Sequence, residues 1–163
     1  MSSAPHPSSK ITGDLRDLQE TLVREIPMCG VMGIRVVASG DDGLTVELPL
    51  DPNRNHRQTA FAGSLNALCT VAGWGATFLL LRELDQTGDI VIRRSAIRYQ
   101  QPVDWCQIVA RCHPVTPAAR QYFLEMLEEK GQGKLDLVVE ISSSNQVAVV
   151  FHGSYVVSRA THP

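Results

Sequence analysis

The chain has 163 residues, 44% of them hydrophobic and 20% charged, which is ordinary for one folded domain with its own core. A formal net charge of -2 leaves no broad basic field, so nucleic acid is not an expected partner. The four cysteines form no CxxC pair and the five histidines lie at no ligand spacing from a cysteine, so we expect reduced thiols and no metal site.

The N-terminal segment, residues 1–10, lacks the basic start and the apolar run of a signal peptide. We predict a disordered tail there, one domain over residues 11–160, and a cytoplasmic protein. The first helix is predicted over residues 13–27, where apolar side chains recur at spacings of three and four and form one stripe. These side chains are Leu15, Leu18, Leu22 and Ile26. Pro27 is expected to end the helix.

Two strands are predicted next, over residues 31–39 and 43–50, with the turn GDDG between them. In the second strand Leu44, Val46 and Leu48 occupy alternate positions, which is the period of a strand with one buried face. The two strands are expected to form a hairpin.

Residues 60–81 carry no charge, and such a segment suits either a membrane span or a helix buried in a protein core. Ser64, Asn66 and Thr70 interrupt the apolar run, and the alternating strands elsewhere need a core partner. We therefore predict no membrane span, but a helix over residues 62–83, roughly 30 Å long and enclosed by the sheet.

Four further strands and one further helix are predicted. The strands cover residues 90–103, 106–115, 134–143 and 145–159. Between them, Thr116 as N-cap, Pro117 at the first helical position and Gly131 as a stop signal predict a helix over residues 116–133, with a strand as the alternative. This order predicts an α+β domain in which a curved antiparallel sheet of about six strands wraps the long helix. That architecture is the hot-dog fold.

Three groups of motifs carry a resemblance to a known family: NRN at 53–55, TAFAGSL at 59–65 followed by AGWG at 72–75, and FHGSYVV at 151–157. With these motifs the chain resembles hot-dog thioesterases over nearly its whole length. The resemblance is closest to the thioesterase domain that follows an acetyltransferase domain in some bacterial proteins. It implies hydrolysis of an acyl thioester carried by coenzyme A or by acyl carrier protein, and assembly as a homodimer or tetramer. It implies no cofactor beyond the coenzyme A or phosphopantetheine of the substrate.

The resemblance also implies a site at the start of the long helix. In the phenylacetate-type branch of these enzymes an Asn, a His-Gly-Gly turn and then a catalytic carboxylate introduce the helix. On this sequence the Asn falls on Asn55, the turn on Phe61, Ala62 and Gly63, and the carboxylate position on Thr70. The amides of Ala62 and Gly63 are then the implied oxyanion donors, while a threonine hydroxyl is no general base at neutral pH.

Each side chain of this site has a structural interpretation as well. Asn55 could hold a water or a carbonyl, or shape the loop as an Asx-turn residue. Thr70 could hold a ligand, or bond back to a carbonyl of the preceding turn. Ser64 is expected to act as a cap-type hydroxyl rather than as a nucleophile, because no His stands in a triad pattern. Asn53 lies in the turn signal DPN.

Five residues are predicted to bind substrate around this site: Asn53, Thr59, Phe61, Arg98 and Tyr99. Arginines before the helix and on the following strand could meet the phosphates of the carrier, or form a solvated surface. These arginines are Arg54, Arg57, Arg93, Arg94 and Arg98. Trp74 and Phe78 are expected to belong to the core.

Two alternative functions remain from the sequence. With Thr70 in place of a carboxylate, the chain could bind acyl thioesters without hydrolysing them. The stretch DPNRNH, with Asp51 and His56 at its ends, also matches the Asp-x-Asn-x-x-His spacing of hot-dog enoyl-CoA hydratases, but Arg54 stands where those enzymes have proline.

Overall fold

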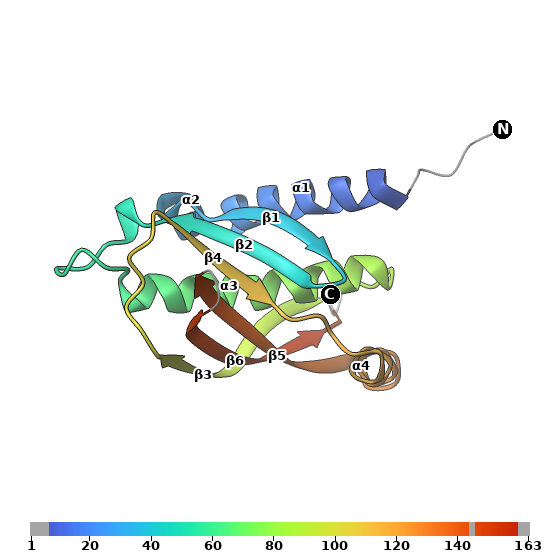
Figure 1. The fold of residues 1–163 in the computed structure, drawn as a ribbon. Helices are drawn as coiled ribbons and strands as arrows, with labels where there is room; N and C mark the ends of the chain where they lie inside the picture. Colours follow the sequence, from blue (N-terminus) through green and yellow to red (C-terminus); the bar gives the residue numbers. More distant parts are fainter. Residues whose placement is uncertain (1–6, 144–145, 160–163) are drawn as a thin grey trace.

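The computed structural model describes residues 7–143 and 146–159, and it contains one long helix wrapped by one antiparallel sheet (Figure 1). The six strands lie in the order β1-β2-β4-β5-β6-β3. They are β1 Arg35–Gly40, β2 Gly43–Pro49, β3 Asp89–Tyr99, β4 Gln107–Cys112, β5 Gln132–Ser143 and β6 Gln146–Ser158. The helices are α1 Pro7–Glu25, α2 Pro27–Met32, α3 Ala62–Glu83 and α4 Pro117–Lys130, with a short 3-10 turn over Asp51–Asn53. The predicted α+β hot-dog architecture is confirmed.

The N-terminal region differs from its prediction in two ways. Helix α1 begins at Pro7 and so reaches into the predicted tail, since proline is well accommodated in a first helical turn. Pro27 does end α1, but it then begins the short helix α2 where we predicted the start of a strand. Gly33, with φ 74°, closes α2 in the left-handed conformation, so β1 begins only at Arg35. Residues 1–6 of the predicted tail, and residues 144–145 where the last two predicted strands meet, lie outside the described residues.

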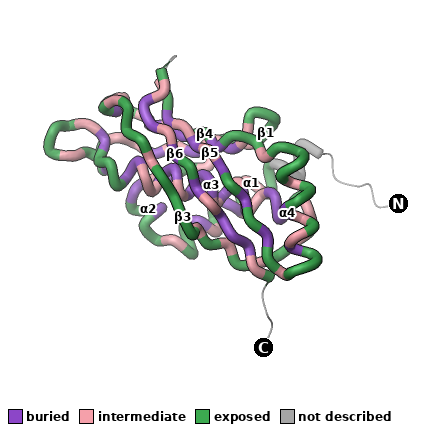
Figure 2. The backbone as a smooth tube through the Cα atoms, turned by 90° about the horizontal axis from the view of Figure 1, so that it is seen from below, coloured by how far each residue is buried: buried purple, intermediate pink, exposed green. Residues whose placement is uncertain are grey.

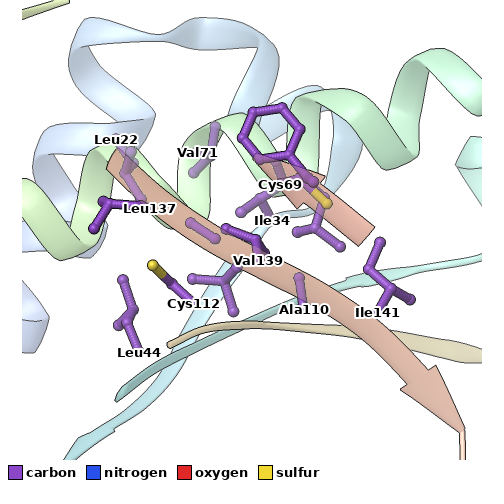
Figure 3. Close-up of a cluster of buried hydrophobic side chains, with 14 of the residues drawn as sticks. Leu22, Ile34, Leu44, Cys69, Val71, Ala110, Cys112, Leu137, Val139 and Ile141 are labelled. Atoms are coloured by element: carbon purple, nitrogen blue, oxygen red, sulfur yellow. The ribbon is translucent and has the colours of Figure 1, made fainter. Parts of the chain in front are cut away.

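Helix α3 lies inside the curve of the sheet because it is apolar on nearly every side. Figure 2 shows buried backbone along α3 and mostly exposed backbone along β3. Around its middle, Cys69 lies among side chains of β4 and β5 such as Ala110 and Val139 (Figure 3). The helix is long and apolar enough to pass a length-and-composition test for a membrane span, but 61% of its most apolar window is buried within the protein.

One close contact fixes α3 against β6. A Cβ on Gly73 would lie 2.3 Å from the Tyr155 hydroxyl oxygen, so only glycine lets this ring pack against the helix. The Tyr155 hydroxyl donates to the Thr70 carbonyl oxygen at 2.8 Å. This bond satisfies a buried phenol and ties the helix to the sheet one turn before Gly73.

Helix α4 confirms the helical interpretation of residues 116–133, and the strand alternative is wrong. The Thr116 hydroxyl accepts from the Ala119 N–H at 3.3 Å, and Gly131 ends the helix at φ 67°. Phe123 and Leu127 are buried against the sheet, which supplies the packing that a short helix needs.

The sheet has two edge strands, β1 and β3. Strand β3 pairs with β6 on one side, and most of its residues are exposed. Its last residue, Tyr99, lies at the start of α3, because its hydroxyl donates to the Ala62 carbonyl oxygen at 3.1 Å. The predicted site therefore lies beside a free sheet edge.

Candidate active site

The start of α3 presents backbone donors that have no partner. Phe61 is the N-cap residue and offers no capping side chain, and the first helical bond is from the Leu65 N–H to the Phe61 carbonyl oxygen. The N–H groups of Ala62, Gly63 and Ser64 come before that bond, and within the described part of the chain they donate to nothing. Since the helix dipole is positive at this end, the exposed Ala62 and Gly63 amides can receive an oxygen atom that carries negative charge.

Phe61 covers one side of this helix start. Its ring is 55% exposed, and a Cβ on Gly63 would lie 2.3 Å from its Cε1 atom. A larger residue at position 63 would therefore displace the ring of Phe61 from the helix start. An aromatic side chain already uses the space that the missing Cβ leaves beside the helix start.

Asn55 organises the loop before the helix. Its Oδ1 accepts from the N–H groups of Arg57 (2.8 Å) and Thr59 (3.3 Å). Its Nδ2 donates to the Thr59 hydroxyl oxygen (2.9 Å) and to the Ala60 carbonyl oxygen (3.2 Å). Both amide protons are therefore used, which is the loop-shaping arrangement that the sequence left open beside a ligand-binding one.

Asn53 is buried beneath the same loop. Its side-chain Nδ2 donates to the carbonyl oxygens of Met32 (2.9 Å) and Pro49 (2.8 Å). The backbone carbonyl of Asn53 accepts from the Phe61 N–H (2.7 Å). These bonds join α2, β2 and the helix start into one unit. Asn53 therefore supports the site from below, and its amide has no proton left for a ligand.

Helix α3 carries a second polar group beyond its first turn. The Thr70 hydroxyl donates to Asn66 Oδ1 at 3.3 Å, so it does not bond back to a backbone carbonyl as one of our alternatives held. Thr77 makes that backbone bond instead, to the Gly73 carbonyl oxygen at 2.9 Å. Asn66 and Thr70 are both partly exposed, on the side of α3 that continues from Ala62. Our sequence interpretation did not assign Asn66 a role, although its four-residue spacing from Thr70 was a usable signal.

Ser64 lies in the first turn and is buried, with 8% of its surface exposed. Within the described residues its hydroxyl makes no hydrogen bond, and no buried side-chain oxygen or nitrogen is left unpartnered. The hydroxyl must therefore reach accessible surface at the helix start. It makes no cap bond of the kind we predicted, because Ser64 is already the third helical residue.

The remaining predicted residues divide into two groups. Tyr99 lies at the helix start through its bond to Ala62, and Thr59 lies in the Asn55 loop. Arg98 is the neighbour of Tyr99 on β3 and so points to the opposite face of the sheet. The structure thus separates Arg98 from the helix start.

Three titratable groups that pack around the middle of α3 keep their protons near neutral pH. Burial raises the pKa of the Cys69 and Cys112 thiols to about 12, and it raises the pKa of the Tyr155 phenol as well. Over the described residues, no three His, Cys, Asp or Glu side chains gather as a metal site would require. The helix start can thus hold and polarise an oxygen, but it carries no carboxylate of its own.

The hydratase alternative gains no support from the loop. The Asp51 carboxylate forms a surface ion pair with Arg54 at 2.6 Å. His56 is exposed, and no bond joins it to Asp51 among the described residues. An Asp and a His that share acid-base work would have to meet around one water.

Arginines of β3 border an open groove on the other face of the sheet. The groove has a volume of about 910 Å³ and lies between β3, β5, β6 and α4. Arg93 and Arg94 line it together with Lys130 and Lys134, and Asp136 is the one acid among its lining residues. Lys134 is paired with that acid at 3.0 Å. The groove is therefore a local basic surface on a chain whose net charge is -2.

Comparison with known proteins agrees with this fold. The model of one family, described as putative thioesterase (yiiD_Cterm), matches residues 15–159. A solved putative thioesterase from Shewanella oneidensis is 30% identical over 91% of this chain and 99% of that chain, with a TM-score of 0.78. A protein of unknown function from Chlorobaculum tepidum is 26% identical over 92% of this chain and 97% of its own, with a TM-score of 0.87. A thioesterase from Haemophilus influenzae is 16% identical over 91% and 92% of the two chains, with a TM-score of 0.68, and it shows the shared fold alone. The predicted resemblance to hot-dog thioesterases is confirmed, while the link to an acetyltransferase domain stays a prediction.

Proposed function

This chain belongs to the family described as putative thioesterase (yiiD_Cterm), and from that membership we propose that it hydrolyses acyl thioesters by direct attack of water. The observation that carries the proposal is the set of free N–H groups at the exposed start of α3. A thioester carbonyl oxygen becomes negatively charged when water attacks its carbon. Amide donors that already point at this oxygen stabilise that charge without having to reorient.

The proposed mechanism assigns a different task to each part of the site. The amides of Ala62 and Gly63 receive the carbonyl oxygen, and removing one such donor in other enzymes costs on the order of 3 kcal/mol. We assign the attacking water to Ser64, because its hydroxyl reaches the surface here. The attacking water loses a proton to the surrounding solvent as its oxygen bonds to the carbonyl carbon. The carbon–sulfur bond then breaks, and because an ordinary thiol has a pKa of about 8.5, the sulfur departs as a thiolate near neutral pH with little help from an acid.

We propose that the acyl group is carried by coenzyme A or by acyl carrier protein. Both carriers present a phosphopantetheine arm, so no cofactor is needed beyond the substrate itself. The groove lined by Arg93, Arg94 and Lys130 supports an anionic carrier, because these side chains make no ion pair within the described residues. The four cysteines are all free, which suits our proposal that the protein acts in the cytoplasm.

We further propose that two chains join their β3 edges to form a homodimer, which could pair again into a tetramer. A free edge strand exposes unpaired backbone groups, and pairing with a second copy satisfies them. Tyr99 ends β3 at the helix start, so each site would lie at the boundary between the two subunits.

A second candidate function is favoured by one observation. Thr70 stands at the position of the usual carboxylate, and its hydroxyl is directed at Asn66 rather than held free as a base. Such a chain could bind acyl thioesters without turnover. In that case it would act as a binding module for the same carriers.

Thiol release from a panel of acyl-CoA and acyl-carrier-protein thioesters tests the two functions against each other. We expect release by the native chain. If the native chain is inactive but Thr70→Asp releases thiol, the binding module is the correct function, because a carboxylate then supplies the missing base.

A further inference from the structure

We infer that Asn66, with Thr70 as its positioning residue, supplies the side-chain amide that donates a hydrogen bond to the acyl carbonyl oxygen. The inference rests on the proposed thioester function and assigns a substrate contact to a residue outside the predicted site. Its basis is the state of the three asparagine amides around the helix start.

Two of these amides have no donor left to offer. Asn53 gives its protons to the Met32 and Pro49 carbonyls, at 2.9 and 2.8 Å. Asn55 gives its protons to Thr59 and Ala60, at 2.9 and 3.2 Å. An amide has two protons, so a ligand could bind either Nδ2 only by breaking a bond that shapes the loop.

The third amide, that of Asn66, still has its NH₂ group free to donate. Asn66 Oδ1 accepts from the Thr70 hydroxyl at 3.3 Å, and this contact holds the amide beside Thr70. Within the described part of the chain, the Asn66 Nδ2 group donates to no acceptor. No buried and unpartnered side-chain nitrogen occurs there either, so this NH₂ group reaches accessible surface. Asn66 is therefore an oriented donor that is still free.

The position of Asn66 fits a carbonyl held at the helix start. It lies one turn beyond Ala62 on the same side of α3, about 6 Å further along the axis. The Oδ1 end of the Asn66 amide contacts Thr70, one turn further from the helix start, which leaves the Nδ2 end on the other side of the amide group and open to a ligand at the first turn. One oxygen atom can then accept from the backbone and from the Asn66 side chain together.

Thr70 is held from the core, and this is why it can orient Asn66. Its carbonyl oxygen accepts from the buried Tyr155 hydroxyl at 2.8 Å, and Gly73 leaves the space for that ring. The backbone that carries the Thr70 hydroxyl is therefore fixed to β6. A donor with a fixed orientation loses little entropy when it binds, which is what a carbonyl site requires.

Kinetics of three variants test the inference if the native chain hydrolyses a thioester. We expect Asn66→Ala to lower kcat by about 10²- to 10³-fold, as loss of one oxyanion donor does in other enzymes, with a smaller change in KM. Thr70→Val should lower kcat by about tenfold, and Thr70→Ser, which keeps the hydroxyl, should restore it. Gln121→Ala removes an exposed amide from α4 and serves as the control. Retention of kcat within twofold in Asn66→Ala, with native thermal unfolding, would overturn the inference.

A binding experiment tests the same contact without turnover. The probes are two coenzyme A analogues: a ketone, in which a methylene group replaces the thioester sulfur, and a thioether that lacks the carbonyl oxygen. We expect the native chain to prefer the ketone in calorimetric titrations, and this preference to fall about tenfold in Asn66→Ala, the size of one hydrogen bond. An unchanged preference, or none in the native chain, contradicts the inference. An inactive chain that still shows the expected pattern refutes hydrolysis alone.

Discussion

Single residues at the middle of α3 connect the protein core to the candidate site. Tyr155 donates to the backbone of Thr70, and the Thr70 side chain donates to Asn66, so a chain of two hydrogen bonds runs from β6 to the accessible side of α3. The bond from Tyr155 to Thr70 can form only because residue 73 is glycine, since any larger residue would occupy the space of the Tyr155 ring. The geometry of the site therefore depends on a residue without a side chain.

We predict that Gly73→Ala destabilises the protein by about 1–3 kcal/mol, the usual range for overpacking a core. A new Cβ would lie 2.3 Å from the Tyr155 hydroxyl oxygen, so the ring or the helix must move and the bond to Thr70 is lost. Denaturant unfolding with a fixed m-value measures this change.

Gly13→Ala is the matched control for that substitution. Gly13 also lies in a helix, α1, but a Cβ there would meet nothing within 4 Å. Alanine should then stabilise the protein by up to about 1 kcal/mol, because it favours the helix more than glycine does. If both variants shift stability in the same direction, helix propensity and not the Tyr155 contact decides the effect at Gly73.

At the scale of elements, α3 and β4 pack together through a buried contact that includes two thiols. Cys69 of α3 and Cys112 of β4 are fully buried, and burial is the chief reason that the pKa of each thiol rises from 9.0 to about 12. A raised pKa in the folded state means that folding favours the neutral thiol. This stability is complete below the unfolded pKa and is lost as the pH rises toward the folded one.

We therefore predict a falling free energy of unfolding between about pH 9 and 12. Each thiol contributes a slope of about 1.4 kcal/mol per pH unit, since the unfolded chain releases a proton that the folded chain keeps. Urea unfolding at several pH values measures the slope. Cys112→Ala should make this slope shallower by the contribution of one thiol, about 1.4 kcal/mol per pH unit. This change in slope is expected whether or not the variant changes the free energy of unfolding at pH 7. An identical slope in the variant would show that other groups dominate.

The elements also show how far the sequence could lead. The caps of α4 and the apolar run of α3 are local signals, so both helices were predicted with nearly their observed bounds. Helix α2 was missed because six residues hold too few turns to establish a helical period. At the site, the resemblance located the helix start correctly. The bond between Tyr155 and Thr70 spans 85 residues, and no local pattern predicts a contact of that kind.

For the whole molecule, the sheet edges determine how two chains could assemble. Strands β1 and β3 both lie at an edge, but only β3 ends at the start of α3, where Tyr99 contacts Ala62. Both edges carry a bulge, β1 between Val36 and Ala38 and β3 between Ile92 and Arg94, so the position of Tyr99 rather than the bulges distinguishes the two edges. The proposed dimer therefore uses β3, and it brings the two sites to the shared boundary.

Two valines with equal exposure allow this assembly to be tested. Val91 on β3 and Val37 on β1 are each 49% exposed, so lysine should change the folding stability of either strand little. We predict that Val91→Lys weakens dimer formation at least tenfold, because each of the two chains then brings an extra positive charge to their junction. Val37→Lys should leave the dimer unchanged. Sedimentation at several protein concentrations measures both. Thioesterase activity should decline with the dimer fraction in Val91→Lys; a monomer with full activity would show that each helix start works alone, and that the subunit boundary forms no part of the site.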